Sequence, residues 1–428
     1  MKIFINPSKT TWPQLTVRPQ LALEFLESSV RNIFNRVKKS GDNALRELTL
    51  QFDKVNVGNL AVSKEEFQNA EKSLSQPLKD AIKTAAANIE KFHSAQKRES
   101  VKIETTPGVT CWRRAVPIDK IGIYIPGGSA PLFSTVLMLG VPARIAKCSQ
   151  VILCSPPDKT GEINPAILFA AQLVGIDRVY KVGGAQAVAA MAFGTESIER
   201  VYKIFGPGNQ YVTKAKQLVT EEGIAIDMPA GPSEVLIMAD ESSNPEFVAA
   251  DLLSQAEHGH DSQVILVVNN QNLVQPIQKE IEAQLKDLPR RAIAEKALLH
   301  SRAIVIENLK EAIEFVNEYA PEHLIINMKG ASSIALEIVN AGSVFLGNYS
   351  PEAIGDYASG TNHTLPTNGY AKAFAGVALE SFMKFITYQE LTKEGILALG
   401  PVVELMAEAE QLMGHKKAVQ VRINSLKK

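Results

Sequence analysis

The amino-acid sequence predicts an α/β fold of two domains, each built on a parallel sheet, with a helical region before them and a small helical tail after them. The chain has 428 residues, and single hydrophobic cores stop growing at about 250–300 residues. From residue 112 to residue 327, short apolar runs alternate with helical stretches. This rhythm is typical of strand–helix–strand units and parallel sheets.

The first hundred residues predict an arm followed by helices. Three prolines and little periodicity indicate an extended arm over residues 1–24. Apolar residues at helical spacing then predict a helix that Gly41 ends and a second helix after it. Ser63 and Glu66 have the spacing of a capping box, and a longer helix follows. His93 stands on that helix beside charged neighbours, and we interpret it as a surface residue.

Two sets of apolar runs predict the strands of the two sheets. The first set comprises 121–125, 151–154, 179–182 and 201–205. The second set comprises 234–238, 264–268, 303–306 and 324–327. Helical stretches such as 166–174 and 185–193 separate the strands, and after Phe374 the pattern returns to helix.

Composition and charge exclude several classes of protein. Lys and Arg total 45 against 46 Asp and Glu, so the charge carries no footprint of a nucleic-acid partner. Three cysteines without a CxxC pair indicate a reducing compartment. The first ten residues lack a secretory signal, and the most apolar stretch, 130–146, is interrupted by prolines and falls short of a membrane span. We expect a cytoplasmic protein with neither a nucleic-acid nor a membrane partner.

Glycine-rich turns follow three strands of the first set. They are Pro126-Gly127-Gly128, Gly183-Gly184 and Gly206-Pro207-Gly208-Asn209. Ligands of open α/β sheets bind beyond the carboxyl ends of strands, and glycine lets backbone amides approach a phosphate. No GxGxxG stretch with an acidic residue at the expected distance occurs, so tight structural turns are the alternative. Three such turns on consecutive units favour a nucleotide cleft.

The stretch DLLSQAEHGHDSQ, residues 251–263, places two potential metal ligands at helical spacing. Gln255 and His258 are three residues apart and would share one face near a helix end that Gly259 terminates. An amide oxygen and an imidazole form half of a metal site. His260 lies beyond the glycine, poorly placed to share an ion with His258, and is left out of the site.

A carboxylate and an imidazole stand side by side at Glu322 and His323, before an apolar run. Neighbouring side chains on an extended segment point to opposite sides, so a hydrogen-bonded dyad is not expected. Both would border one cleft if the backbone turns there. For an isolated dipeptide, a solvated pair is the simpler interpretation.

Further polar residues lie toward the end of the chain. Asp356 and His363 belong to a Gly-rich polar loop, a kind of segment that often carries binding residues. Asp356 would complete a metal site with the helix-end ligands, and His363 would donate to a substrate oxygen. An Asx turn with an exposed histidine is the alternative. Glu410 and His415 lie on either side of Gly414, five residues apart, so they would not share one helix face. A pair of solvated side chains is the simpler interpretation.

Seven segments in this order make the chain similar to the histidinol dehydrogenase family over nearly its whole length. They are IPGGSAPLFSTVLM from Ile125, GGAQAVAAMAFGT from Gly183, GPGNQYV from Gly206, DMPAGPSEVL from Asp227, DLLSQAEHG from Asp251, APEHL from Ala320 and GDYASGTNHTLPT from Gly355. The resemblance implies oxidation of L-histidinol to L-histidine through an aldehyde, the last two steps of histidine biosynthesis, with two NAD and one zinc ion.

On this resemblance we expect two incomplete Rossmann-like α/β domains, which agrees with the missing GxGxxG. Residues 111–233 would form the nucleotide-binding domain. Residues 25–110 together with 234–373 would form the substrate domain, and 1–24 an arm. Residues 374–428 would form a tail that packs on the partner subunit of a homodimer.

The resemblance also implies the roles of individual residues. Zinc would bind Gln255, His258, Asp356 and His415 of the partner subunit. Glu322 and His323 would be the acid–base residues. Substrate contacts would come from Ser233, Gln255, His258, Glu322, Asp356, His363, Glu410 and His415. Tyr124, Gln186 and Asn209 would line the NAD site.

These residue types suit that chemistry. Imidazole, amide and carboxylate ligands suit Zn²⁺, which would hold the amino alcohol beside the nicotinamide. A histidine with an ordinary pKa near ~6.5 suits a base that acts in both oxidations, and Glu322 would activate water at the aldehyde. A covalent route through a cysteine is the competing mechanism. A metal-dependent binding protein without turnover and a zinc dehydrogenase for another amino alcohol are the competing functions.

Overall fold

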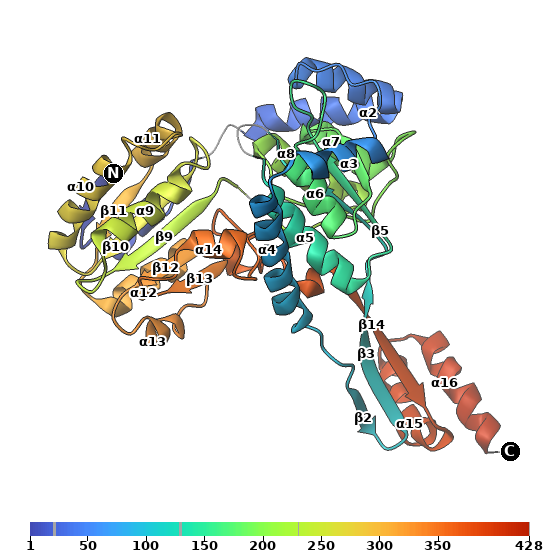
Figure 1. The fold of residues 1–428 in the computed structure, drawn as a ribbon. Coiled ribbons are helices and arrows are strands. Elements are labelled where there is room, and N and C mark those ends of the chain that lie inside the picture. Colours follow the sequence, from blue (N-terminus) through green and yellow to red (C-terminus); the bar gives the residue numbers. More distant parts are fainter. Residues whose placement is uncertain (20–22, 128–130, 230, 428) are drawn as a thin grey trace.

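The structure, a computed structural model, describes residues 1–19, 23–127, 131–229 and 231–427. Residues 20–22 of the expected arm, Gly128 of the first glycine-rich turn and Ala230 lie outside the described residues. Over the described residues, the strands form three sheets. Two α/β bodies stand side by side, and a slender module projects away from them (Figure 1).

The first body is built on a six-stranded parallel sheet with the order β1-β11-β10-β9-β12-β13. Its strands are β1 (Lys2–Ile5), β9 (Glu234–Ala239), β10 (Gln263–Val268), β11 (Arg302–Val305), β12 (His323–Asn327) and β13 (Ser343–Leu346). The central strands are buried along their length, because helices cover both faces of a parallel sheet. The start of the expected arm is itself edge strand β1, paired with β11.

Helices cover both faces of this sheet. The residues that pack on one face come from α9 (Pro245–Ala256), α10 (Val274–Gln284) and α11 (Arg291–Leu299). Those on the other face come from α1 (Trp12–Leu15), α12 (Leu309–Tyr319) and α13 (Ala331–Ala335). The short helix α14 (Glu352–Tyr357) follows β13 and contacts α9. Short 3-10 turns occur at Lys9–Thr11, Gln271–Leu273, Tyr370–Lys372 and Leu379–Phe382.

The second body is built on a five-stranded parallel sheet with the order β6-β5-β4-β7-β8. Its strands are β4 (Lys120–Tyr124), β5 (Gln150–Ser155), β6 (Arg178–Lys181), β7 (Lys203–Phe205) and β8 (Ala225–Ile226). The residues that pack on one face come from α3 (Lys64–Ser73), α4 (Gln76–Ser94), α5 (Phe133–Ala146) and α6 (Pro165–Leu173). Those on the other face come from α2 (Leu23–Phe52), α7 (Gly184–Phe193) and α8 (Gln210–Val219), which a 3-10 turn at Thr220–Glu222 follows.

The placement of the N-terminal helices corrects the expected grouping of 25–110 with 234–373. α2, α3 and α4 bury their apolar stripes against helices of the five-stranded body, so they extend its core rather than that of the six-stranded body. Two local predictions are confirmed. Gly41 interrupts α2 with a backbone φ of 47°, and Ser63 and Glu66 form the capping box of α3.

His93 on α4 is buried, which makes its interpretation as a surface residue wrong. Its Nδ1 lies 2.9 Å from the backbone carbonyl of Ile89. Ile82, Ala86 and Ile89 precede it at helical spacing on the buried face of α4. The apolar stripe, rather than the charged neighbours, decides its environment.

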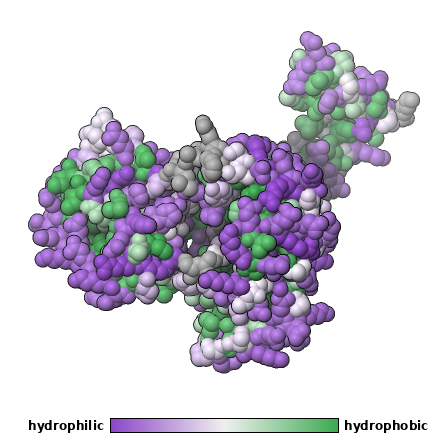
Figure 2. Space-filling view, turned by 90° about the horizontal axis from the view of Figure 1, so that it is seen from above, coloured by the Kyte–Doolittle hydropathy of each residue, from purple (hydrophilic) through white to green (hydrophobic). Residues whose placement is uncertain are grey.

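The projecting module combines two distant parts of the chain. Strand β3 (Val109–Pro117) pairs antiparallel with β2 (Lys102–Thr106) and with β14 (Met383–Leu391). Helices α15 (Lys393–Ala409) and α16 (Met413–Leu426) pack on each other after β14. The tail after Phe374 is therefore only partly helical. Apolar side chains are visible on the module's surface, apart from the two bodies (Figure 2). Among the described residues, no helix has both the length and the apolar character that crossing a bilayer requires.

Candidate active site

The expected acid–base residues lie at the amino end of β12, beside the amino end of β9. Glu234 is the first residue of β9, and His323 is the first residue of β12, directly after Glu322. Ala320, which caps α12, has a left-handed backbone with a φ of 53°, and Pro321 follows it. This turn breaks the extended alternation that adjacent residues of a strand would have.

The turn brings the side chains of Glu322 and His323 together. Both are buried, and Glu322 Oε2 lies 3.6 Å from His323 Nδ1. They share no direct hydrogen bond. Instead, Nδ1 lies 3.2 Å from the backbone carbonyl of Glu234, and Glu322 Oε2 accepts from the backbone N–H of Glu234 at 2.9 Å. The two side chains therefore lie close together, which the sequence allowed only if the backbone turned there.

Asp356 approaches the other side of the imidazole. Its Oδ1 lies 3.3 Å from His323 Nε2, and its side chain is 13% exposed. Asp356 lies on α14 rather than in an open loop, one helical turn after the buried Glu352. The histidine is therefore held between two carboxylates, Glu322 on the Nδ1 side and Asp356 on the Nε2 side.

Gln255 is fully buried next to this group. In the amide orientation that satisfies its neighbours, its nitrogen donates to Glu352 Oε1 at 2.8 Å and its oxygen accepts from the backbone N–H of Glu234 at 2.9 Å. His258 lies two residues beyond the end of α9, in a turn where its N–H donates to the carbonyl of Gln255 at 3.3 Å. It was expected in the last helical turn. It is exposed, whereas Gln255 is not.

His363 connects the two bodies. Its Nε2 lies 3.0 Å from the hydroxyl of Thr135 on α5. The preceding Asn362 donates its amide to the carbonyl of Met138 on the same helix at 2.6 Å. Ser233 is half-buried immediately before β9. Of the predicted substrate residues, His363 thus lies at the junction of the two bodies, and Ser233 lies at the amino end of β9, next to Glu234.

The remaining two predicted residues lie elsewhere in this chain. Glu410 caps the end of α15 and His415 stands in the first turn of α16, both exposed on the projecting module. The structure does not bring them together with Gln255, His258 and Asp356 of the same chain.

A cavity of about 1210 Å³ opens at the carboxyl ends of the five-stranded sheet. Tyr124, Gln186 and Asn209 all line it, together with residues of α2. The backbone N–H of Gly184, at the start of α7, donates to the Tyr124 hydroxyl at 3.1 Å. Gly206 has a φ of 123°, and a Cβ there would lie 2.0 Å from the Tyr124 carbonyl, so only glycine lets the strands meet this closely. The three expected cofactor residues therefore share one cavity.

Burial and charge shift the pKa values of the expected acid–base residues. Burial raises the pKa of Glu322 to about 8, against the opposing influence of His323. Burial alone would lower the pKa of His323, but the carboxylates of Glu322 and Asp356 outweigh it and raise that pKa well above the ordinary value. Burial raises the pKa of Glu352 to about 8 as well. Strongly shifted pKa values concentrate at functional sites.

The residues present fit a metal ion only in part. In the described residues, no three His, Cys, Asp or Glu side chains gather closely enough to hold an ion by themselves. Gln255 is not of these types, yet its carbonyl oxygen has a second lone pair besides the one that accepts from Glu234. The charges of His258 and His323 both act on the Asp356 carboxylate, so among the described residues these donors belong to one neighbourhood without forming a closed set of ligands. The donor set, with nitrogen and oxygen ligands, suits zinc once a further ligand comes from outside the chain.

Comparison with known proteins decides the family. The family model described as histidinol dehydrogenase matches residues 16–423. A curated histidinol dehydrogenase of Bacteroides fragilis (strain YCH46) is 57% identical over 428 residues, covering 100% of both chains. The chain belongs to the histidinol dehydrogenase family. The curated enzyme of Escherichia coli (strain K12) is 53% identical over 417 residues, 97% of this chain and 95% of that protein.

The fold is shared as well. The crystal structure of histidinol dehydrogenase from Elizabethkingia anophelis has a TM-score of 0.98 and 56% identity, covering 100% of this chain and 99% of that chain. The resemblance stated from the sequence motifs is thus confirmed, and so is the mixed α/β architecture. A member of the histidinol dehydrogenase family is an oxidoreductase that acts in histidine biosynthesis.

Three residues of the site escaped the sequence analysis: Glu234, Glu352 and Thr135. Glu234 contacts both acid–base residues, and Glu352 contacts Gln255. Glu234 could have been found from the sequence, because it is a carboxylate at the first position of the apolar run EVLIM. Thr135 lies inside an apolar helix and gave no signal, because its partner His363 is 228 residues away.

Proposed function

We propose that this protein oxidises L-histidinol to L-histidine through L-histidinaldehyde, the last two steps of histidine biosynthesis, with two NAD and one Zn²⁺ per subunit. The observation that carries the proposal is the buried His323 imidazole between Glu322 and Asp356, beside Gln255. In the overall reaction, histidinol, water and two NAD⁺ give the histidine carboxylate, two NADH and three protons. Each step moves one hydride to NAD.

The first oxidation removes a hydroxyl proton while a hydride leaves the carbinol carbon. His323 is the proposed base, acting through Nε2, because Nδ1 faces the carbonyl of Glu234 and must donate there. When the Asp356 carboxylate is engaged by a cation, it stabilises the imidazolium less, which lowers the pKa of His323 toward the range of a working base. Glu322 is the proposed base for the water that adds to the aldehyde. Ser233, His363 and Glu410 are the proposed further contacts to substrate.

Gln255, His258 and Asp356, with His415 of the partner subunit, are the proposed zinc ligands, and all four would also lie against the substrate. Zinc supplies a Lewis acid that binds and orients the amino alcohol. Although His258 as a residue is exposed, protein atoms around its imidazole displace water and lower its pKa, which Asp356 opposes. The neutral imidazole is the form that binds a metal ion.

The cavity at the carboxyl ends of the five-stranded sheet is the proposed NAD site. Tyr124, Gln186 and Asn209 line it, and glycines flank it, as phosphate approach requires. A homodimer with shared active sites is proposed from the projecting module, which exposes many apolar side chains. Val402, Val403, Leu405, Met406, Leu412 and Met413 are each at least 36% exposed. Exposed apolar patches of this kind mark association surfaces. Free cysteines fit a cytoplasmic location.

The ratio of NADH formed to histidinol consumed tests this function. Two NADH per histidinol, with histidine as product, support the proposed four-electron oxidation. One NADH per substrate would point to a dehydrogenase that stops at the aldehyde or prefers another amino alcohol. No NADH in zinc-supplemented protein would leave a metal-dependent binding protein as the better interpretation.

A further inference from the structure

A buried ion pair, Arg18 with Glu234, lies next to Glu322 and His323. Arg18, which follows α1, places its guanidinium fork on Glu234: Nε lies 2.8 Å from Oε2 and Nη2 lies 3.0 Å from Oε1. The Arg18 side chain is 8% exposed and that of Glu234 is 1% exposed. Two parallel charge-assisted bonds of this type fix orientation as well as energy.

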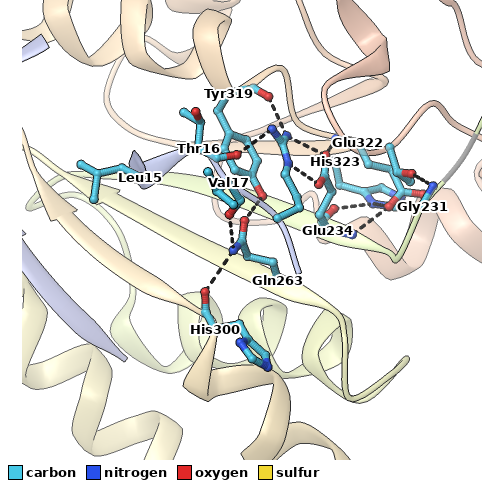
Figure 3. A network of polar contacts seen from close by, with 12 residues as sticks. Leu15, Thr16, Val17, Gly231, Glu234, Gln263, His300, Tyr319, Glu322 and His323 are labelled. Carbon is cyan, nitrogen blue, oxygen red and sulfur yellow. Dashed lines mark hydrogen bonds and ion pairs between the residues drawn. The ribbon is translucent and has the colours of Figure 1, made fainter. Parts of the chain in front are cut away.

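Glu234, held by Arg18, in turn contacts both Glu322 and His323. Its backbone N–H donates to Glu322 Oε2 at 2.9 Å, and its carboxylate Oε1 accepts from the backbone N–H of Glu322 at 3.3 Å. Its backbone carbonyl lies 3.2 Å from His323 Nδ1. A carbonyl only accepts, so this contact holds the imidazole in the form with hydrogen on Nδ1 and leaves Nε2 to take up a proton. Figure 3 shows Glu234, Glu322 and His323 grouped at one end of the network.

Arg18 is itself held firmly. Nη2 donates to the carbonyl of Tyr319 at 2.6 Å, and Nη1 donates to the carbonyl of Thr16 at 3.1 Å. The guanidinium stacks on the Tyr319 ring, 3.7 Å from its centre. The Tyr319 hydroxyl donates to Gln263 Oε1 at 3.0 Å, a contact visible in Figure 3. The guanidinium is therefore fixed in place before any substrate binds.

We propose that Arg18 is a positioning residue for the oxidation: by fixing Glu234, it sets the places of Glu322 and His323. This inference rests on the proposed function, because it concerns the residues that would carry the chemistry. Without Arg18, the Glu234 carboxylate would be a buried charge without its partner, which is strongly destabilising and forces rearrangement. That rearrangement would move the backbone groups that orient Glu322 and His323.

A purely structural role for Arg18, holding the N-terminal segment on the sheet, is the alternative. The chain offers a matched control for it. Arg302 on β11 holds the same segment through Nη1, which donates to the carbonyls of Leu15 at 2.6 Å and Val17 at 3.2 Å. Within the part of the chain that the structure describes, Arg302 forms no hydrogen bond to Glu234, Glu322 or His323. A structural role would therefore treat Arg18→Met and Arg302→Met alike.

The test compares Arg18→Met and Arg302→Met in the zinc-loaded, full-length enzyme. We expect Arg18→Met to lower kcat for histidinol about 10- to 100-fold, as misplacement of reacting groups does, while KM for histidinol and NAD changes much less. We expect Arg302→Met to lower Tm but to keep kcat near wild type. Zinc content is measured in both variants. Equal zinc with unequal kcat supports the inference, and equal losses of kcat at equal losses of Tm would overturn it.

A second variant tests the inference if Arg18→Met folds poorly. Glu234→Gln keeps the backbone contacts and the side-chain shape but removes the charge that Arg18 binds, so it should also reduce kcat. In the double variant Arg18→Met/Glu234→Gln, the losses should not add, because the two residues act as a unit. Additive losses contradict the inference. An inactive wild type would instead refute the proposed function, which separates the two failures.

Discussion

His323 Nε2 lies 3.3 Å from Asp356 Oδ1, and this contact joins the first residue of β12 to helix α14. The same imidazole has Glu322 on its other side at 3.6 Å. One ring is thus shared between the proposed zinc ligand and the proposed acid–base partner. A substitution of Glu322 or of Asp356 would therefore affect the same proposed base, His323. Measuring the rates of the two oxidations separately distinguishes the effects of the two substitutions.

Replacing the imidazole should impair both oxidations. We expect His323→Asn to lower kcat by about 10²–10⁴-fold with histidinol and with histidinaldehyde, because both steps lose their general base. NADH formation with each substrate measures this. His300→Asn is the control, since His300 is an exposed histidine beyond the end of α11. Wild-type rates in His323→Asn would exclude His323 as the base.

Replacing the carboxylate of Glu322 should affect the two oxidation steps unequally. We expect Glu322→Gln to lower the rate with histidinaldehyde more than the rate with histidinol, since only the aldehyde step needs activated water. The accumulation of aldehyde during histidinol turnover, trapped with a hydrazine reagent, gives an independent measure. Equal losses in both steps would contradict the assigned role of Glu322.

The cysteines should be dispensable for catalysis. Burial raises the pKa of the Cys148 thiol to about 12 and raises that of Cys154 further, so neither is a thiolate near neutral pH. We expect Cys111→Ser, Cys148→Ser and Cys154→Ser to keep kcat within about threefold of wild type, a loss attributable to packing. Steady-state assays on each variant suffice. An inactive but folded single variant would revive the covalent route.

Zinc content distinguishes two neighbouring histidines. We expect His258→Asn to lose most of its zinc after dialysis, whereas His260→Asn keeps it, because only the first belongs to the proposed ligand set. Both residues are exposed and stand two positions apart, which makes them a matched pair. Elemental analysis gives the metal per subunit without an activity assay. Full zinc in His258→Asn would remove it from the site.

Mixing inactive variants tests whether subunits share sites. His323→Asn and His415→Asn should each be inactive alone. In a mixed dimer, the body with an intact His323 receives an intact His415 of the partner subunit, so one site per dimer is complete. We expect activity to return after the two proteins are unfolded and refolded together. Persistent inactivity, with mixed dimers demonstrated by differently tagged chains, would contradict shared sites.

The sequence predicted the two parallel sheets because their strands are buried on both faces. All eight expected runs became strands with ends shifted by two residues or fewer, from β4 to β12. Continuous apolar runs such as VILVV are typical of covered parallel strands. The antiparallel β2, β3 and β14 were not predicted. β14 is largely exposed, and its partner β3 lies more than 250 residues earlier in the chain.

The site was predictable in its residue types but not in its local geometry. Motifs identified the expected acid–base, metal and cofactor residues, and the structure groups Glu322, His323, Asp356 and Gln255. The left-handed turn at Ala320 and the helical setting of Asp356 were not visible, because they are backbone conformations that the residue types at these positions do not specify. The proposed roles of Arg18 and Glu234 depend on a pairing over 216 residues, which hydrophobic periodicity does not report.

The two proposed sites lie at opposite ends of the strands in their two sheets. The proposed NAD cavity lies at the carboxyl ends of strands, whereas Glu234 and His323 are the first residues of their strands. The carboxyl rim of the six-stranded sheet, where the loops after β9 to β12 run, therefore carries none of the assigned residues. That rim is the place to graft peptides, attach labels or vary sequence in an engineered enzyme without disturbing turnover.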